Sequence, residues 1–177
     1  IASLLESKGV VSKTAFLNLT QTPDGIRQLH ASFPLPETTL EGYLFPDTYF
    51  FQRNESPVKV VEEMLLNFST KFYRPYLKEM EKRKSNLQEV VTIASLIEKE
   101  AKAPQDRTRI AGVIYNRLEK KQRLEIDATV LYALGKHKDR VLYADLKVNS
   151  PYNTYRVAGL PPAAIANPGL NSLVAAL

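Results

Sequence analysis

Two glutamates near the middle of the chain, Glu98 and Glu100, are the side chains best suited to acid–base chemistry. Three apolar residues precede Glu100 at helical spacing, so that the four positions fall at i, i+3, i+4 and i+7. These apolar residues are Ile93, Leu96 and Ile97. A carboxylate that continues an apolar stripe is desolvated, which raises its pKa above the usual value of about 4.3. A general acid working near neutral pH needs such a pKa, so the pattern indicates Glu100 as a candidate acid/base.

Glu98 does not form a paired-carboxylate site with Glu100. Residues two apart on a helix point to nearly opposite sides, so only one of these glutamates can face a given cleft. A glutamate at a helix end is also a common structural residue, paired with a nearby lysine or arginine. The residue pattern alone leaves the catalytic and the structural interpretation of Glu100 open.

Other reaction classes find no support in the residue pattern. His30 and His137 lack partners at metal-ligand spacing, and there is no glycine-rich phosphate loop. Ser95 is followed at the third position by Glu98, where penicillin-binding-type serine enzymes need lysine. The sequence contains no cysteine, which excludes disulfides and thiolate metal sites. We therefore expect neither a metal nor a cofactor.

A helix over residues 86–102 should position Glu100. Ser85 and Gln88 form a capping-box pattern at its start, and Pro104 limits it at the far end. A second helix should follow Pro104, since apolar residues recur there at helical spacing.

The candidate binding residues lie further along the chain. Asp127 begins a short helix that should stop at Gly135, and it is either the N-cap or a substrate-binding carboxylate. Residues 150–169 contain four prolines and two glycines, which is typical of a long ordered loop forming one wall of a cleft. Three side chains there could hydrogen-bond or stack on sugars, with ordinary loop packing as the alternative: Tyr152, Asn153 and Tyr155. Glu41 and Asp47 are further acidic candidates.

The fold class expected from these patterns is α+β and predominantly helical. Residues 1–33 read as two short helices and a linker, with a boundary near the proline-rich segment at residue 34. Residues 34–177 then form the main domain. Within it, residues 39–51 are rich in Tyr, Phe and Thr, which favours short extended pieces broken at Pro46.

The net charge of +5 favours anionic partners without choosing among them. The N-terminal helix pair lacks a basic recognition face, so nucleic acid is not expected as a partner. Residues 71–84 hold six basic and two acidic side chains, either as a solvated face or as a contact with anionic lipid or wall polymer.

Six sequence blocks, in this order, resemble the MltG/YceG-like endolytic murein transglycosylases. The blocks are LEGYLFPDTY (40–49), TIASLIEKEA (92–101), AGVIYNRL (111–118), LEIDATVLYALG (124–135), SPYNTY (150–155) and GLPPAAIANPG (159–169). The catalytic glutamate of that family is the second Glu of its E-K-E motif, which corresponds here to Glu100.

The resemblance implies a lytic transglycosylase, a lyase acting on nascent peptidoglycan strands. In this mechanism Glu100 protonates the glycosidic oxygen between N-acetylmuramic acid and N-acetylglucosamine. The same residue, now a carboxylate, helps the muramoyl C6 hydroxyl attack C1, which gives a 1,6-anhydromuramoyl end. The nucleophile belongs to the substrate, so a second catalytic carboxylate is not required, unlike in the two-carboxylate glycosidases.

The resemblance also implies a location and partners. The family is anchored in the bacterial cytoplasmic membrane and works on its periplasmic face, with cell-wall synthases as expected partners. By the same resemblance, residues 1–33 correspond to a truncated LysM-like remnant, and the chain is expected to be a fragment of a longer protein. No apolar run here reaches the roughly 18 residues that span a bilayer.

A non-catalytic alternative remains. The chain could be a glycan-binding or cell-wall-synthesis scaffold in which Glu100 is a structural carboxylate. That scaffold would bind glycan equally well after Glu100→Gln and would form no anhydro product.

Overall fold

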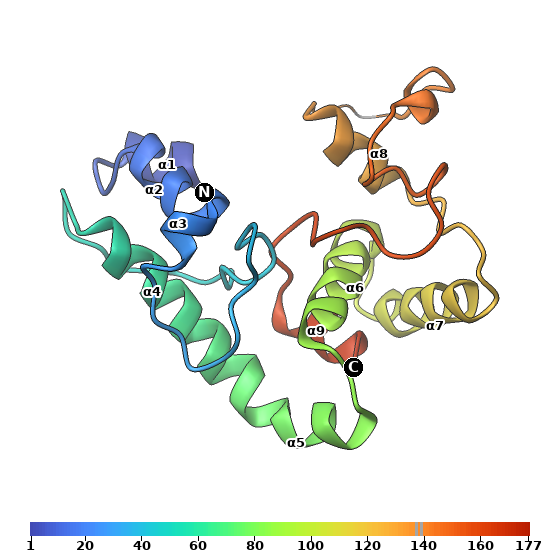
Figure 1. Cartoon of the computed structure of the whole chain (residues 1–177), viewed down its shortest axis with the longest axis horizontal. Coiled ribbons are helices and arrows are strands. Elements are labelled where there is room, and N and C mark those ends of the chain that lie inside the picture. Colours follow the sequence, from blue (N-terminus) through green and yellow to red (C-terminus); the bar gives the residue numbers. More distant parts are fainter. Residues whose placement is uncertain (137, 139) are drawn as a thin grey trace. The chain divides into compact units, whose positions relative to one another are not determined.

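The computed structural model describes residues 1–136, 138 and 140–177, which fold as helices joined by loops (Figure 1). His137, considered above as a metal ligand, lies outside the described residues. The chain divides into two compact units, Ile1–Lys78 and Glu79–Leu177. The boundary expected near residue 34 concerns the domain organisation of the family and stays a prediction.

The first unit contains four α-helices and a π-helical turn: α1 (Ala2–Ser7), α2 (Lys13–Gln21), α3 (Pro23–Ile26), α4 (Pro57–Phe68) and η1 (Ser69–Tyr73). Helix α5 (Arg74–Arg83) crosses the division. The second unit contains α6 (Leu87–Glu100), α7 (Asp106–Glu119), α8 (Asp127–Leu134), the 3-10 turn η2 (Asp145–Lys147) and α9 (Leu170–Ala175).

The expected α+β class is wrong, because no strand occurs in the part of the chain that the structure describes. A LysM-like remnant in an α+β fold is therefore not supported either. Residues 39–51 have β-forming composition, yet such preference has an effect only where a partner strand is present.

Aromatic residues of the first unit pack into a helical core instead of a sheet. The ring of Phe33 lies 5.0 Å from that of Phe68 and 6.0 Å from that of Tyr43, measured between centroids. The N–H of Leu40 donates to the carbonyl of Thr20 (2.8 Å), and that of Tyr43 donates to the carbonyl of Leu40 (3.0 Å). Residues 40–43 therefore turn against α2 and α4, and their backbone groups are satisfied without a strand ladder.

Helix α6 is the central element of the second unit and contacts α7, α8 and α9 (Figure 1). Every residue from 90 to 97 is buried, as expected for a helix that is apolar on nearly all sides. The helix predicted over residues 86–102 is thus confirmed, although its cap differs. Asn86, rather than Ser85, is the N-cap, and its Oδ1 accepts hydrogen bonds from the N–H groups of Gln88 (2.8 Å) and Glu89 (3.3 Å).

Candidate functional site

Glu100 ends α6 at the point where this helix leaves the core. The side chain of Glu100 is partly exposed to solvent, whereas full burial extends only as far as Ile97. It lines a cavity of about 750 Å³ within the second unit. Helix α8 supplies Asp127, Ala128 and Tyr132 to the same cavity. The apolar stripe therefore leads to a cavity wall, and Glu100 is accessible to a ligand.

The surroundings of Glu100 favour its protonated form. Partial burial against the cavity wall raises the pKa of Glu100, and the charge of Asp127 raises it further. The N–H of Ala128, which donates a hydrogen bond to the carboxylate, and the Lys102 ammonium act in the opposite direction. The effects that raise the pKa of Glu100 outweigh those that lower it. The carboxyl group is therefore shifted toward the protonated form that a general acid needs.

Asp127 stands beside Glu100 at the start of α8. It is the first residue of that helix, with Ile126 as the N-cap, so the N-cap expected at Asp127 is shifted by one position. The hydroxyl of Tyr155 donates a hydrogen bond to Oδ1 of Asp127 (2.6 Å). Burial and this hydrogen bond to Asp127 raise the pKa of Tyr155 to about 12. The structure thus brings Glu100, Asp127 and Tyr155, three of the five candidates, into one electrostatic arrangement.

Two buried threonines position this arrangement, and sequence reasoning missed both. The hydroxyls of Thr129 and Thr154 lie 2.9 Å apart, and the Thr154 hydroxyl also accepts from the N–H of Ile126 (3.0 Å). The N–H of Glu125 donates to the carbonyl of Thr154 (3.1 Å). The start of α8 is therefore tied to the loop that carries Tyr155. Each threonine lies within a block that carried the family resemblance, but neither spacing nor composition singled it out.

The two remaining candidates pack within the protein. Asn153 is fully buried, and its amide donates to the carbonyls of Leu146 (3.0 Å) and Val148 (2.8 Å). These contacts favour the loop-packing alternative for Asn153. The ring of Tyr152 lies 4.8 Å from that of Tyr132, measured between centroids, and Tyr132 lines the cavity. Tyr152 thus supports a cavity residue.

Glu98 has a different role from Glu100. Its Oε2 accepts hydrogen bonds from the hydroxyl of Ser172 (2.5 Å) and from the N–H of Gly169 (3.2 Å). Gly169 is the N-cap of α9, so the Glu98 carboxylate lies at the start of that helix, where negative charge is favourable. The two glutamates face separate surroundings, as their spacing predicted.

The further acidic candidates, Glu41 and Asp47, belong to the first unit. The carboxylate of Asp47 accepts hydrogen bonds from the Lys71 ammonium, the Asn67 amide (2.7 Å) and the N–H of Thr48 (2.9 Å). These donors, Lys71 foremost, lower the pKa of Asp47 to about 2. This carboxylate connects residues 47–48 with α4 and η1.

The described part of the chain has neither a metal-binding cluster nor a membrane-spanning helix. Across residues 1–136, 138 and 140–177, no group of three or more His, Asp or Glu side chains is arranged to hold a metal ion. Nδ1 of His30 lies 3.1 Å from Oε1 of Glu62 in the first unit. Within the same described ranges, none of the helices has the length and hydropathy needed to cross a membrane.

Comparison with known proteins gives a consistent set of matches. Residues 1–177 match the YceG-like family. A Bacillus subtilis (strain 168) protein named endolytic murein transglycosylase is 42% identical over 187 aligned residues, covering 100% of this chain and 52% of the relative. A protein of the same name from Streptococcus pneumoniae serotype 2 (strain D39 / NCTC 7466) is 35% identical over 182 residues, covering 94% of this chain and 33% of the relative.

A solved structure has the same fold. The 2.6 Å crystal structure of the yceG-like protein lmo1499 from Listeria monocytogenes matches with a TM-score of 0.85 and 37% identity. The match covers 98% of this chain and 60% of that chain. This chain spans about half the length of the Bacillus relative and about a third of the Streptococcus relative.

Proposed function

The chain belongs to the YceG-like family, and we propose that it forms part of a peptidoglycan lytic transglycosylase with Glu100 as the acid/base. The observation that carries this proposal is the position of Glu100, an accessible carboxyl group with a raised pKa on the wall of a 750 Å³ cavity. The names of the curated relatives, endolytic murein transglycosylase, support the choice of substrate.

The proposed reaction uses Glu100 twice. As an acid it protonates the oxygen between N-acetylmuramic acid and N-acetylglucosamine, and the C1–O bond breaks. As a carboxylate it then accepts the proton of the muramoyl C6 hydroxyl, whose oxygen forms the new bond to C1. The N–H of Ala128 stabilises the carboxylate between these steps.

Asp127 has a supporting role in this scheme. Glycosidic cleavage passes through a transition state with oxocarbenium character, that is, with positive charge at C1. A carboxylate on the same cavity wall stabilises that charge and keeps Glu100 protonated before the reaction. The hydrogen bond from Tyr155 holds Asp127 in place for both purposes.

The shared cavity also favours a second candidate function, hydrolysis of the same bond. Glu100 and Asp127 line one cavity, so a pair of carboxylates is present although no pair was apparent in the sequence. In the hydrolytic scheme Asp127 would orient a water molecule toward C1. The product would be a reducing muramoyl end in place of the anhydro end.

Product analysis separates these schemes. The full chain is incubated with uncrosslinked, peptide-bearing glycan strands, and the new ends are identified by mass spectrometry. Anhydro ends, lighter by one water than reducing ends, support the lytic reaction, whereas reducing ends support hydrolysis. Intact strands that remain bound would support the scaffold alternative, in which Glu100 serves only to cap α8 through the N–H of Ala128.

The location and partners are part of the same proposal. We infer from the family that the longer protein is anchored in the cytoplasmic membrane, acts on its outer face and cooperates with cell-wall synthases. Cell fractionation with protease treatment of spheroplasts tests the location. A protein that stays protected from external protease would contradict it.

A further inference from the structure

A second, smaller cavity adjoins the cavity of Glu100. It has a volume of about 210 Å³ and shares Asp127, Arg140 and Val141 with the larger one. The rest of its wall comes from Leu142, Tyr143, Leu146 and Tyr155. The two cavities therefore meet at Asp127, Arg140 and Val141, and a chain-like ligand bound in one can continue into the other.

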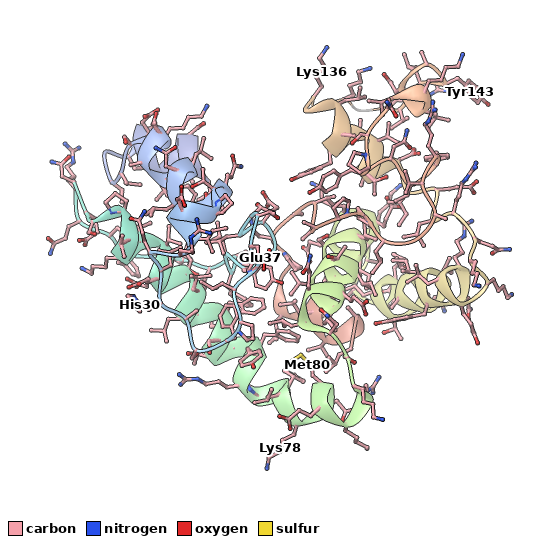
Figure 2. The ribbon with its side chains drawn as sticks, viewed as in Figure 1. His30, Glu37, Lys78, Met80, Lys136 and Tyr143 are labelled. Carbon is pink, nitrogen blue, oxygen red and sulfur yellow. The ribbon has the colours of Figure 1, made fainter. Side chains whose placement is uncertain are left out.

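The rim of the smaller cavity displays an exposed aromatic ring. Tyr143 is 90% exposed, and its neighbour Leu142 is 55% exposed. Figure 2 shows Tyr143 and Lys136 beside α8, in the part of the second unit that surrounds the two cavities. A tyrosine ring combines an apolar face with a polar tip, which suits contact with the faces and hydroxyls of a sugar.

The turn that carries Tyr143 is held in place by hydrogen bonds. The carboxylate of Asp145 accepts from the N–H of Leu142 (2.9 Å) and from the ammonium of Lys138 (2.7 Å). The buried amide of Asn153 also donates a hydrogen bond to the carbonyl of Leu146 (3.0 Å), which belongs to the same segment. Because these hydrogen bonds fix the backbone of the turn, little backbone freedom is lost when Tyr143 binds a ligand, which favours a recognition role.

Arg140 gives the junction of the two cavities a positive charge. Its side chain is exposed, and no ion-pair partner for it occurs among the described residues. A guanidinium group presents parallel N–H donors that match a carboxylate. Muramoyl units carry carboxylates, either on the lactyl group or on the stem peptide, whereas a strand of N-acetylglucosamine alone has none.

We propose that the smaller cavity is a further subsite for an anionic glycan strand, in which the Tyr143 ring stacks on a sugar and Arg140 binds a muramoyl-side carboxylate. This inference rests on the proposed function for the identity of the strand. Binding is nevertheless measurable without cleavage, so the two can fail separately.

The test measures dissociation constants with the full chain carrying Glu100→Gln, which prevents turnover. Three probes of equal length are compared: a peptide-bearing strand, the same strand with its peptides removed, and an uncharged N-acetylglucosamine oligosaccharide. Tyr143→Ala should weaken binding of all three about tenfold. Arg140→Gln should weaken binding of the carboxylate-bearing strands about tenfold and leave the uncharged probe unchanged.

Two matched controls lie on α7, away from both cavity linings. Val113→Ala removes an exposed apolar side chain, and Arg109→Gln removes an exposed cation. Both should bind all probes as the Glu100→Gln protein does. A loss specific to the peptide-bearing strand assigns the carboxylate to the stem peptide. A loss specific to the peptide-free strand assigns it to the lactyl group, whose carboxyl is an amide while the peptide is attached, and an equal loss on both strands means that Arg140 accepts either carboxylate.

Two results would overturn the inference: unchanged affinity of Tyr143→Ala, or an equal effect of Arg140→Gln on the uncharged probe. If wild type cleaves strands while these variants bind normally, the proposed subsite is contradicted and the proposed function is supported. If the variants lose binding while wild type cleaves nothing, the proposed function is contradicted and the proposed subsite is supported.

Discussion

The hydroxyl of Tyr155 donates a 2.6 Å hydrogen bond to the carboxylate of Asp127, whose charge in turn raises the pKa of Glu100. These interactions link Tyr155 in a loop, Asp127 at the start of α8 and Glu100 at the end of α6. The proton affinity of Glu100 therefore depends on two residues that do not need to touch the scissile bond.

Asp127→Asn should lower the pKa of Glu100, because it removes the negative charge that opposes ionisation. Glu100 must be protonated to act as an acid, so activity is lost as pH rises through its pKa. A lower pKa moves this alkaline limb of the pH–rate profile to lower pH. Carbon-13 NMR titration of Glu100 checks the shift without activity. Glu119→Gln, an exposed change at the end of α7, is the control, and an unchanged titration in Asp127→Asn would contradict the account.

Glu98→Gln should destabilise the protein by about 1–3 kcal/mol, because it weakens two hydrogen bonds to an ionised carboxylate at the start of α9. Glu100→Gln should leave stability unchanged or increase it, since it removes a partly desolvated charge. Urea unfolding of both variants measures the difference. Equal stability of the two variants would show that Glu98 does not have the structural role assigned to it.

Part of this site could be predicted from the sequence. The periodicity around Ile93 and the proline at position 104 predicted α6 and placed Glu100 near its end. The spacing of Glu98 and Glu100 correctly predicted separate surroundings. These are local properties, set by the geometry of a single helix.

The rest depended on tertiary contacts that spacing does not encode. Periodicity does not say where a buried helix leaves the core, so the exposure of Glu100 was missed. The hydrogen bond between Asp127 and Tyr155 joins residues 28 apart in sequence, and tertiary contacts such as that between Thr129 and Thr154 bring their segments together. The extended pieces expected around Pro46 failed because no partner strand exists among the described residues.

Asp47→Asn should change the acid stability of the protein. The Lys71 hydrogen bond and two further donors lower the pKa of Asp47 from 3.8 to about 2. The folded state thus binds fewer protons than the unfolded state in this window. The stabilisation is present above pH 3.8 and is lost as pH falls through about 2.

The variant should therefore lose less stability than wild type between pH 4 and pH 2, as followed by urea unfolding at a series of pH values. Lys71→Gln removes the charge that partners Asp47 and should reduce the dependence of stability on pH in the same way. The double variant should add little to either single change, because both remove one interaction. Fully additive effects would mean that the two residues act independently.

The most direct test of the account is the rate of glycan cleavage by Glu100→Gln beside that of Glu98→Gln, each measured on uncrosslinked strands at equal concentrations of folded protein. We expect Glu100→Gln to lose at least about 100-fold in the formation of new muramoyl ends, as for removal of a general acid–base group. Glu98→Gln should cleave at nearly the wild-type rate, since its carboxylate binds α9. Wild-type activity in Glu100→Gln would contradict the central claim.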